Sequence, residues 1–151
     1  MEVADKIIEL LYHCKNLKGG FSVNQLEHCL QTAARAERDN ADDELIVASL
    51  CHDAGKVISR ANHGGIIAAI FKPYVREEVY WVLKMHQIFE GKHYFEYLGK
   101  DPTQYLQYKE EPWYDLCLKF VEWDQAAFDP NFITPPLEYF IPKIRKVFQK
   151  T

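Results

Sequence analysis

The sequence predicts an all-α protein, and three observations support this expectation. Apolar residues recur with a period of about 3.6 residues along almost the whole chain. The alternation of apolar and polar residues that is typical of strands is essentially missing. The 151 residues are 48% hydrophobic and 26% charged, which is the composition of one globular domain with its own core. We therefore expect a helical bundle that forms a single domain over residues 1–151.

Glycines and a capping residue delimit the first two expected helices. The first helix covers residues 3–14 and ends ahead of the glycine pair at 19–20. The second begins at Ser22, whose spacing to Gln25 fits a capping box, and continues to Arg38.

Charge, glycine and proline delimit the next two helices. The third follows the segment 40–44, whose acidic residues suit the positive end of a helix dipole, and it ends at Asp53 before Gly55. The fourth is short, covers residues 63–71 and is ended by Pro73.

The remaining helices occupy the second half of the chain. One covers residues 75–89, and a short helix follows Gly91. A long helix is entered at Pro112, because proline suits the first helical turn. A proline-rich loop at 130–136 precedes a last amphipathic helix over 137–148.

Several ionisable residues occupy helix positions where the apolar pattern predicts core. They are His28, His52, Asp53, His63, His86 and Asp124. His52 shares a face with Leu45 and Ala48, and Asp124 extends the stripe of Cys117 and Phe120. A buried carboxylate needs a cation as partner. A histidine taken singly is more often a hydrogen-bonded core residue, but six such groups in one small domain are hard to satisfy by side-chain pairing.

A metal site satisfies all six side chains together. Imidazole and carboxylate ligands suit iron, manganese, zinc or nickel. Six ligands are too many for one ion that keeps an open coordination position. Two metal ions bridged by a carboxylate fit the set better.

The order of these residues resembles a known signature. His28, followed by the pair His52 and Asp53 and by the distant Asp124, resembles the H…HD…D signature of the HD-domain superfamily, an all-α metal-binding fold. The two other histidines lie between the HD pair and the last aspartate, as in the six-ligand dinuclear version. That version includes di-metal phosphohydrolases and a branch of oxygenases.

Three local strings narrow the resemblance to the oxygenase branch. They are NQLEHCLQ at 24–31, HDAGK at 52–56 and WDQAA at 123–127. They look most like the mixed-valent di-iron oxygenases, in particular the phosphonate-cleaving oxygenases, with inositol oxygenase as a more distant relative. The matching region runs from residue 22 to 132, which is most of the chain.

The resemblance implies two iron ions, as Fe2+ and Fe3+, with O2 as co-substrate. One iron is expected on His28, His52 and Asp124, the other on His63 and His86, with Asp53 bridging the two.

The resemblance also suggests residues that contact the substrate. Lys56 resembles the lysine with which inositol oxygenase contacts a substrate oxygen, and Lys92 resembles a lysine that phosphonate oxygenases direct at the phosphonate. Both are candidate catalytic and substrate-binding residues, although each could also be a solvated lysine at a helix end. Lys18 and Phe21 stand where those oxygenases carry a substrate-reading tyrosine and glutamate. Lys18 could bind an anion, and His93 could touch substrate beside Lys92.

Two enzymatic functions and one binding function remain open at this stage. The leading expectation is an oxygenase that hydroxylates, or cleaves at a C–P or C–C bond, a small anionic hydroxylated substrate such as a hydroxyphosphonate. The alternative is a dinuclear phosphohydrolase acting on a phosphoester with the same ligands. The third possibility is a catalytically inert binding module, but the presence of all six expected ligands argues against it.

Charge and composition bear on partners and location. The net charge of −4 and the lack of a basic block argue against nucleic acid as a partner. The N-terminus has no apolar run for a signal peptide or membrane span, so we expect a cytoplasmic protein that does not bind membranes. The four cysteines form no CxxC pair and are expected to be buried, reduced thiols.

Overall fold

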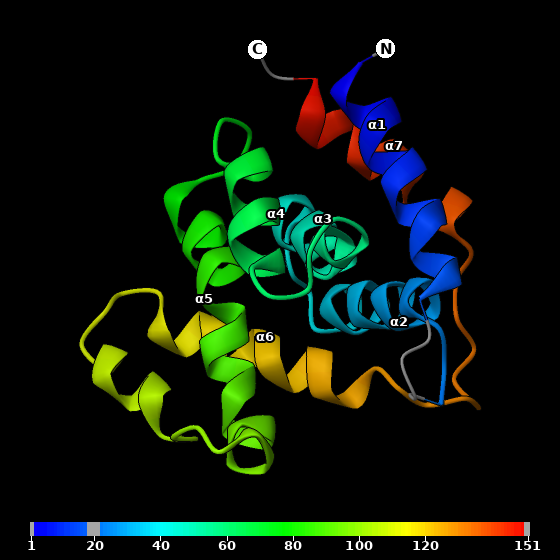
Figure 1. Cartoon of the computed structure of the whole chain (residues 1–151). Helices are drawn as coiled ribbons and strands as arrows, with labels where there is room; N and C mark the ends of the chain where they lie inside the picture. The colour runs from blue at the N-terminus through cyan, green and yellow to red at the C-terminus, as the bar shows by residue number, and fades with distance from the viewer. Residues whose placement is uncertain (1, 18–21, 150–151) are drawn as a thin grey trace.

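The computed structural model describes residues 2–17 and 22–149, and within these ranges the chain forms seven α-helices and no strand (Figure 1). The helices are α1 (Val3–His13), α2 (Gln25–Arg38), α3 (Asp43–Cys51), α4 (His63–Phe71), α5 (Glu77–Tyr94), α6 (Tyr114–Ala126) and α7 (Leu137–Phe148). Short 3₁₀ helices connect them: η1 (Cys14–Asn16), η2 (Ala54–Val57), η3 (Phe95–Leu98) and η4 (Gln104–Tyr108). The expected all-α class is confirmed.

The start of α2 differs from the expected one. Asn24 caps the helix, and its side-chain oxygen accepts a hydrogen bond from the backbone N–H of Glu27 at 2.8 Å. Ser22 lies in a bend outside the helix and donates its hydroxyl to the backbone oxygen of Phe128. A second good capping residue close by therefore took the role assigned to Ser22.

The end of α5 also differs, because the helix continues through Gly91 to Tyr94. Gly91 is buried, and a Cβ there would lie 2.4 Å from ring atoms of Phe95. This glycine permits the close approach of Phe95 and does not stop the helix.

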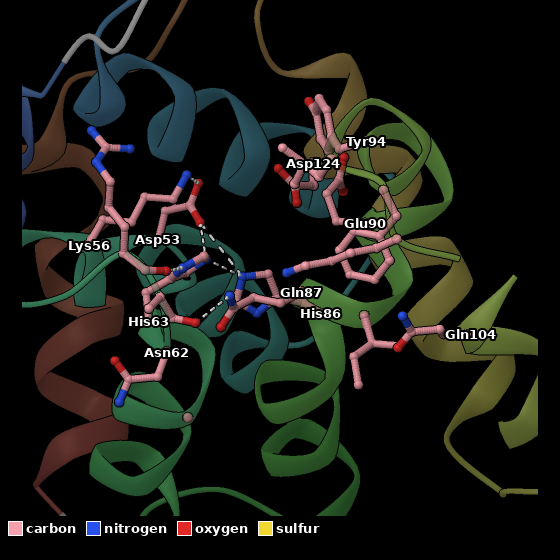
Figure 2. A pocket seen from close by; sticks show the side chains of 18 of the residues that line it. Asp53, Lys56, Asn62, His63, His86, Gln87, Glu90, Tyr94, Gln104 and Asp124 are labelled. Carbon is pink, nitrogen blue, oxygen red and sulfur yellow. Dashed lines mark hydrogen bonds and ion pairs between the residues drawn. The ribbon is translucent and has the colours of Figure 1, made fainter. Parts of the chain in front are cut away.

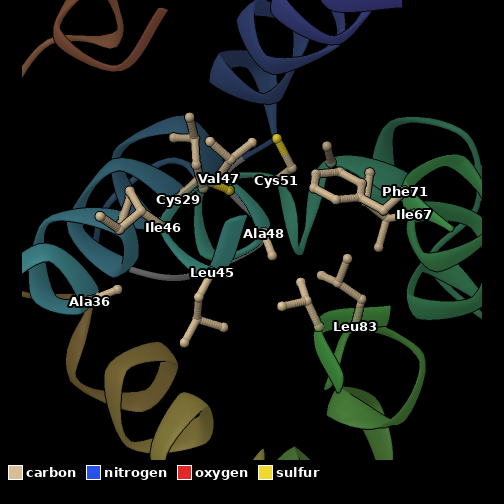
Figure 3. Close-up of a cluster of buried hydrophobic side chains, with 14 of the residues drawn as sticks. Cys29, Ala36, Leu45, Ile46, Val47, Ala48, Cys51, Ile67, Phe71 and Leu83 are labelled. Carbon is tan, nitrogen blue, oxygen red and sulfur yellow. The ribbon is translucent and has the colours of Figure 1, made fainter. Parts of the chain in front are cut away.

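Helix α3 lies at the centre of the bundle (Figure 1). Every residue from Leu45 to Cys51 is buried, as expected for a helix that is apolar on all sides. It packs against α2 and α7 and also touches α5, while α4 packs against α5 and α5 against α6. Figure 3 shows side chains of α2, α4 and α5, among them Ile67 and Leu83, converging on α3. The C-terminal end of α3 is thereby delivered into the interior of the protein.

The four cysteines are free and buried, as expected. Within the described parts of the chain, no helix has the length and apolar character needed to cross a membrane.

Candidate metal centre

Six buried side chains from different helices converge where α3 ends. They are His28 on α2, His52 and Asp53 directly after α3, His63 at the start of α4, His86 on α5 and Asp124 on α6. All six were singled out from the sequence, and the structure brings all six together. They form two groups that share one residue.

The first ligand group consists of His28, His52, Asp53 and Asp124. The Oδ1 atom of Asp124 lies 2.8 Å from Nε2 of His28 and 3.2 Å from Nε2 of His52. The Oδ2 atom of Asp53 lies 3.2 Å from each of the same two nitrogens. The two Nε2 atoms are themselves 3.2 Å apart.

The second ligand group consists of Asp53, His63 and His86. Here the other carboxylate oxygen, Oδ1 of Asp53, lies 3.1 Å from Nε2 of His63 and 3.6 Å from Nε2 of His86 (Figure 2). The two histidine nitrogens are 3.1 Å apart. Asp53 therefore directs one oxygen at each group, which is the arrangement expected of a bridging carboxylate.

Local geometry near Asp53 brings the two groups close. The η2 turn that follows it packs against the start of α4. A Cβ at Gly55 would lie 2.5 Å from the backbone oxygen of His63, so a larger residue would push the two segments apart. The glycine of the HDAGK string thus has a packing role between the two ligand groups.

The hydrogen bonds of the histidines fix which ring nitrogen faces the centre. Each Nδ1 atom lies within hydrogen-bond distance of a backbone carbonyl, which can only accept. The pairs are His28 with Ala127 at 2.9 Å, His52 with Ser49 at 2.7 Å, His63 with Arg60 at 2.8 Å and His86 with Leu83 at 2.7 Å. Nδ1 therefore carries the proton, and in a neutral ring Nε2 presents a lone pair to the centre. Such second contacts to backbone carbonyls are typical of metal-bound histidine.

The donor set fits two metal ions. Lone pairs on nitrogens 3.1–3.2 Å apart repel each other unless a proton or a cation lies between them. Two ligand atoms at right angles on one metal, with bonds of about 2.1 Å, lie about 3 Å apart. The spacings within both ligand groups are close to that value. The mixture of imidazole and carboxylate suits iron, manganese, zinc or nickel and excludes neither redox nor hydrolytic chemistry.

Electrostatics also favour cations at this point. Burial favours the neutral form of Asp124, but His52 and His28 hold the pKa of its carboxyl well below the ordinary value. Burial also favours the neutral form of Asp53, but His52 holds the pKa of this carboxyl well below the ordinary value. Burial opposes protonation of His52, yet the charges of Asp53 and Asp124 hold its pKa well above the ordinary value. For His86, burial is the largest cause and lowers the pKa. Both carboxylates thus remain charged in the interior.

Aromatic and amide side chains hold the ligands in place. The ring of Phe128 stacks on that of His28 with centroids 4.0 Å apart, and Phe120 meets the ring of His52 edge-on at 5.3 Å. Gln87 accepts a hydrogen bond from the backbone N–H of Gly64 at 2.8 Å and so ties α5 to the first turn of α4. These contacts restrict the ligand orientations before any ion binds.

A cavity of about 990 Å³ opens beside the centre (Figure 2). Among the described residues, the lysine and arginine side chains that line it are Lys56, Arg60, Lys84 and Lys100. The Nζ atom of Lys56 lies 3.3 Å from Oδ2 of Asp53, as close to the metal centre as its expected role requires. The surroundings of the cavity therefore suit an anionic molecule.

The structure does not bring Lys92 and His93 to the lining of this cavity. Lys92 is exposed, does not line the cavity and holds its Nζ atom 5.9 Å from the ring centroid of Tyr105. Six residues after His86, it points about 240° around the helix axis from that ligand. His93 is half-buried and also absent from the lining. Lys18 lies outside the described residues.

Glu90 is a cavity residue that was not expected from the sequence. It lies one helical turn after His86, lines the cavity and has both carboxylate oxygens buried. Burial, followed by the charge of Asp124, raises the pKa of Glu90 to about 11. The signal that could have revealed it is the one that revealed Asp124: a carboxylate on an otherwise apolar helix face.

Comparisons with known proteins leave the family open. The chain matches no protein-family model, and none of the curated proteins matches it. The buried His/Asp cluster in a helical bundle is compatible with an HD-like metal site, and the resemblance to that superfamily therefore depends on the ligand residues and the strings around them.

Proposed function

We propose that this chain is a dinuclear iron oxygenase that uses O2 to hydroxylate or oxidatively cleave a small anionic substrate bearing a hydroxyl group. The observation that carries the dinuclear part is the division of the two Asp53 oxygens between the two ligand groups. The choice of oxygenase is supported by the likeness of the strings at 24–31 and 123–127 to mixed-valent di-iron oxygenases.

The first ligand group would hold one iron and the second group the other, with Asp53 shared. When bound, the two irons would supply a Lewis acid for the substrate hydroxyl and the redox chemistry for O2. The protein supplies the rest. The hydrogen bonds of the four Nδ1 atoms hold the imidazole rings in place, so that each Nε2 atom faces the position of a metal ion.

Lys56 is the side chain best placed to bind the anionic part of the substrate. Its ammonium lies beside Asp53 and lines the cavity, so an anion held there would lie next to both ligand groups. This contact would orient the substrate C–H bond toward the centre. Lys56 would bind only the substrate and would not be a ligand of either iron.

Electron paramagnetic resonance at low temperature tests the proposal directly. The protein is loaded anaerobically with iron, partly oxidised and assayed for metal in the same sample. We expect two irons per chain and a spin-coupled mixed-valent signal that hydroxy acids or hydroxyphosphonates perturb. The matched control is His86→Ala, which removes a ligand from the second group alone and should give one iron without the coupled signal. Two irons with no mixed-valent state would refute the oxygenase assignment.

The alternative is a phosphohydrolase on the same ligands. The closeness of Lys56 to Asp53 favours it equally, since an ammonium at that place could stabilise charge on a phosphoryl oxygen. It predicts release of phosphate from p-nitrophenyl phosphate by manganese-loaded protein without O2. A chain that binds no metal stoichiometrically would leave only a binding module.

A further inference from the structure

Lys100 is a cationic residue of the cavity to which the proposed function gives no role. It follows η3 and lines the cavity together with Phe95. Lys56 belongs to a different wall, because it lies in η2. In Figure 2, Lys56 lies on one side of His86, whereas Gln104, which follows Lys100 closely in the chain, lies on the other side. The cavity therefore carries a cationic side chain on each of two walls.

Two backbone hydrogen bonds fix the position of Lys100. The N–H of Gly99 donates to the carbonyl oxygen of Glu96 at 3.3 Å, and the N–H of Lys100 donates to that of Phe95 at 2.8 Å. This pair of bonds is the pattern of a Schellman motif, in which the residue before Lys100 adopts the left-handed conformation. Glycine suits that conformation, and Gly99 has a φ of 70°. Lys100 thus occupies a defined place where the η3 turn ends.

The ring of Phe95 sets where the Lys100 ammonium lies. This ring packs on α5 at Gly91, where a Cβ would lie 2.4 Å from the ring atoms. The Nζ atom of Lys100 lies 5.5 Å from the centroid of the same ring, which is within the range of a cation–π contact. Gly91 lies about 7.5 Å beyond His86 along the helix axis, at a rise of about 1.5 Å per residue. The ammonium is therefore held well beyond the metal ligand, in the part of the wall that η3 forms.

The Lys100 ammonium is accessible and has no anionic partner. Its side chain is exposed, and it forms no ion pair with a carboxylate in the part of the chain that the structure describes. Glu90 lines the same cavity, but its carboxyl lies against Asp124 and both of its oxygens are closed to solvent. An unpaired ammonium in a cavity wall attracts an anionic group of a bound molecule.

The other lysine and arginine side chains of the lining are placed differently. Arg60 follows Lys56 closely in the chain, in the segment between η2 and α4. Lys84 directs its Nζ atom at Trp81, 4.7 Å from the ring centroid, and Trp81 does not line this cavity. Among the described residues, Lys100 is the cation that the segment after α5 contributes to the lining.

We propose that Lys100 is a specificity-determining residue and that the substrate carries a second anionic group, which Lys100 binds. The hydroxyl and the first anionic group would lie at the metal centre and Lys56, and the second anionic group would lie at the other end of the molecule. The cavity volume of about 990 Å³ is at the upper end of the range for ligand pockets and accommodates such a length. The proposal deepens the proposed function and rests on it, because the hydroxyl end must lie at the metal centre.

Three hydroxy acids with the same six-carbon chain test this proposal. 2-Hydroxyadipate ends in a carboxylate, 2-hydroxyhexanoate in a methyl group and 6-amino-2-hydroxyhexanoate in an ammonium group. Calorimetry with anaerobic, iron(II)-loaded protein measures their binding without turnover. A charge-assisted hydrogen bond to Lys100 predicts that 2-hydroxyadipate binds about tenfold or more tightly than 2-hydroxyhexanoate. The acid that ends in an ammonium group should bind most weakly of the three.

Variants of Lys100 isolate the contribution of its charge. In Lys100→Gln the preference for 2-hydroxyadipate should disappear, whereas Lys100→Arg, which keeps the charge, should retain it. Lys100→Glu should instead prefer the acid that ends in an ammonium group. All three variants should keep two metal ions, since Lys100 belongs to neither ligand group. The matched control is Lys109→Gln, which removes an exposed lysine outside the cavity lining and should leave every preference intact.

The outcomes separate this proposal from the proposed function. Equal binding of 2-hydroxyadipate and 2-hydroxyhexanoate to the wild type, or an unchanged preference in Lys100→Gln, would overturn the role of Lys100 and leave the metal centre intact. A loss of metal in Lys100→Gln would also overturn it. A wild type that binds no metal would instead refute the proposed function itself.

Discussion

Replacing Asp53 with asparagine tests whether this residue is shared by two metal ions. The substitution keeps the size of the side chain and removes its charge. The first ligand group would retain two histidines and Asp124, which is enough to hold one ion. The second group would retain only His63 and His86, since its carboxylate is Asp53. The expected change is therefore from two bound ions per chain to one.

The magnitude can be measured as thermal stabilisation. An ion present at a hundredfold excess over its Kd stabilises the folded state by about 2.7 kcal/mol, and a domain of this length gains about 2–4 °C in Tm per kcal/mol. Each ion should then raise Tm by about 5–11 °C, so the wild type should gain about twice as much as the Asp53→Asn variant. Differential scanning calorimetry with metal analysis of the same samples gives both numbers.

The control is Asp115→Asn, which changes an exposed carboxylate on α6 and should preserve two ions and the full shift. Retention of two ions in Asp53→Asn would refute the bridging role. Loss of both ions would show that the first ligand group cannot hold a metal without Asp53, and it would refute the independence of the two groups.

Four further predictions follow from the same geometry. Lys56→Met should keep both metals and bind a hydroxy acid about tenfold more weakly, as calorimetry would show; loss of metal would contradict a substrate role. Gly55→Ala should displace His63 and lower the metal content from two ions toward one, because its Cβ would lie 2.5 Å from the His63 oxygen. Phe120→Ala should cost about 3–5 kcal/mol of unfolding free energy in the metal-free protein, measured with urea, since Phe120 is wholly buried. Metal affinity, measured against a chelator, should rise with pH above about 6.5, because His52 has a raised pKa in the metal-free protein and must lose its proton to bind; an affinity that falls with pH would contradict this.

Much of the fold could be predicted because helical periodicity is strong in this chain. The expected boundaries of the helix at 63–71 and of the last helix agree with α4 and α7. The expected and observed helix boundaries differ where a residue type is compatible with two local structures. Ser22 and Asn24 are both good capping residues, and only packing decides between them. Gly91 fits a helix stop in sequence, but its lack of a side chain serves the contact with Phe95.

The metal ligands could be predicted for a related reason. An ionisable residue on an apolar helix stripe is expected to be buried and therefore to need a partner. The stripes predicted the burial of His52, His86 and Asp124, and all three are buried in the structure. The helical pattern alone could not provide the pairing of the residues into two groups, which only the resemblance to the HD-domain superfamily implied. That pairing depends on how α2 and α6 meet on one side of Asp53 while α4 and α5 meet on the other, and these are long-range contacts.

The substrate residues show the limit of reasoning from nearby residues. Lys92 was expected because it follows His86 closely in sequence, yet position on a helix depends on angle. A step of six residues reaches the far side of α5, whereas the step of four to Glu90 stays on the side of His86. The same rule that placed the ligands thus puts the carboxyl of Glu90, and not the ammonium of Lys92, on the side of α5 that carries His86.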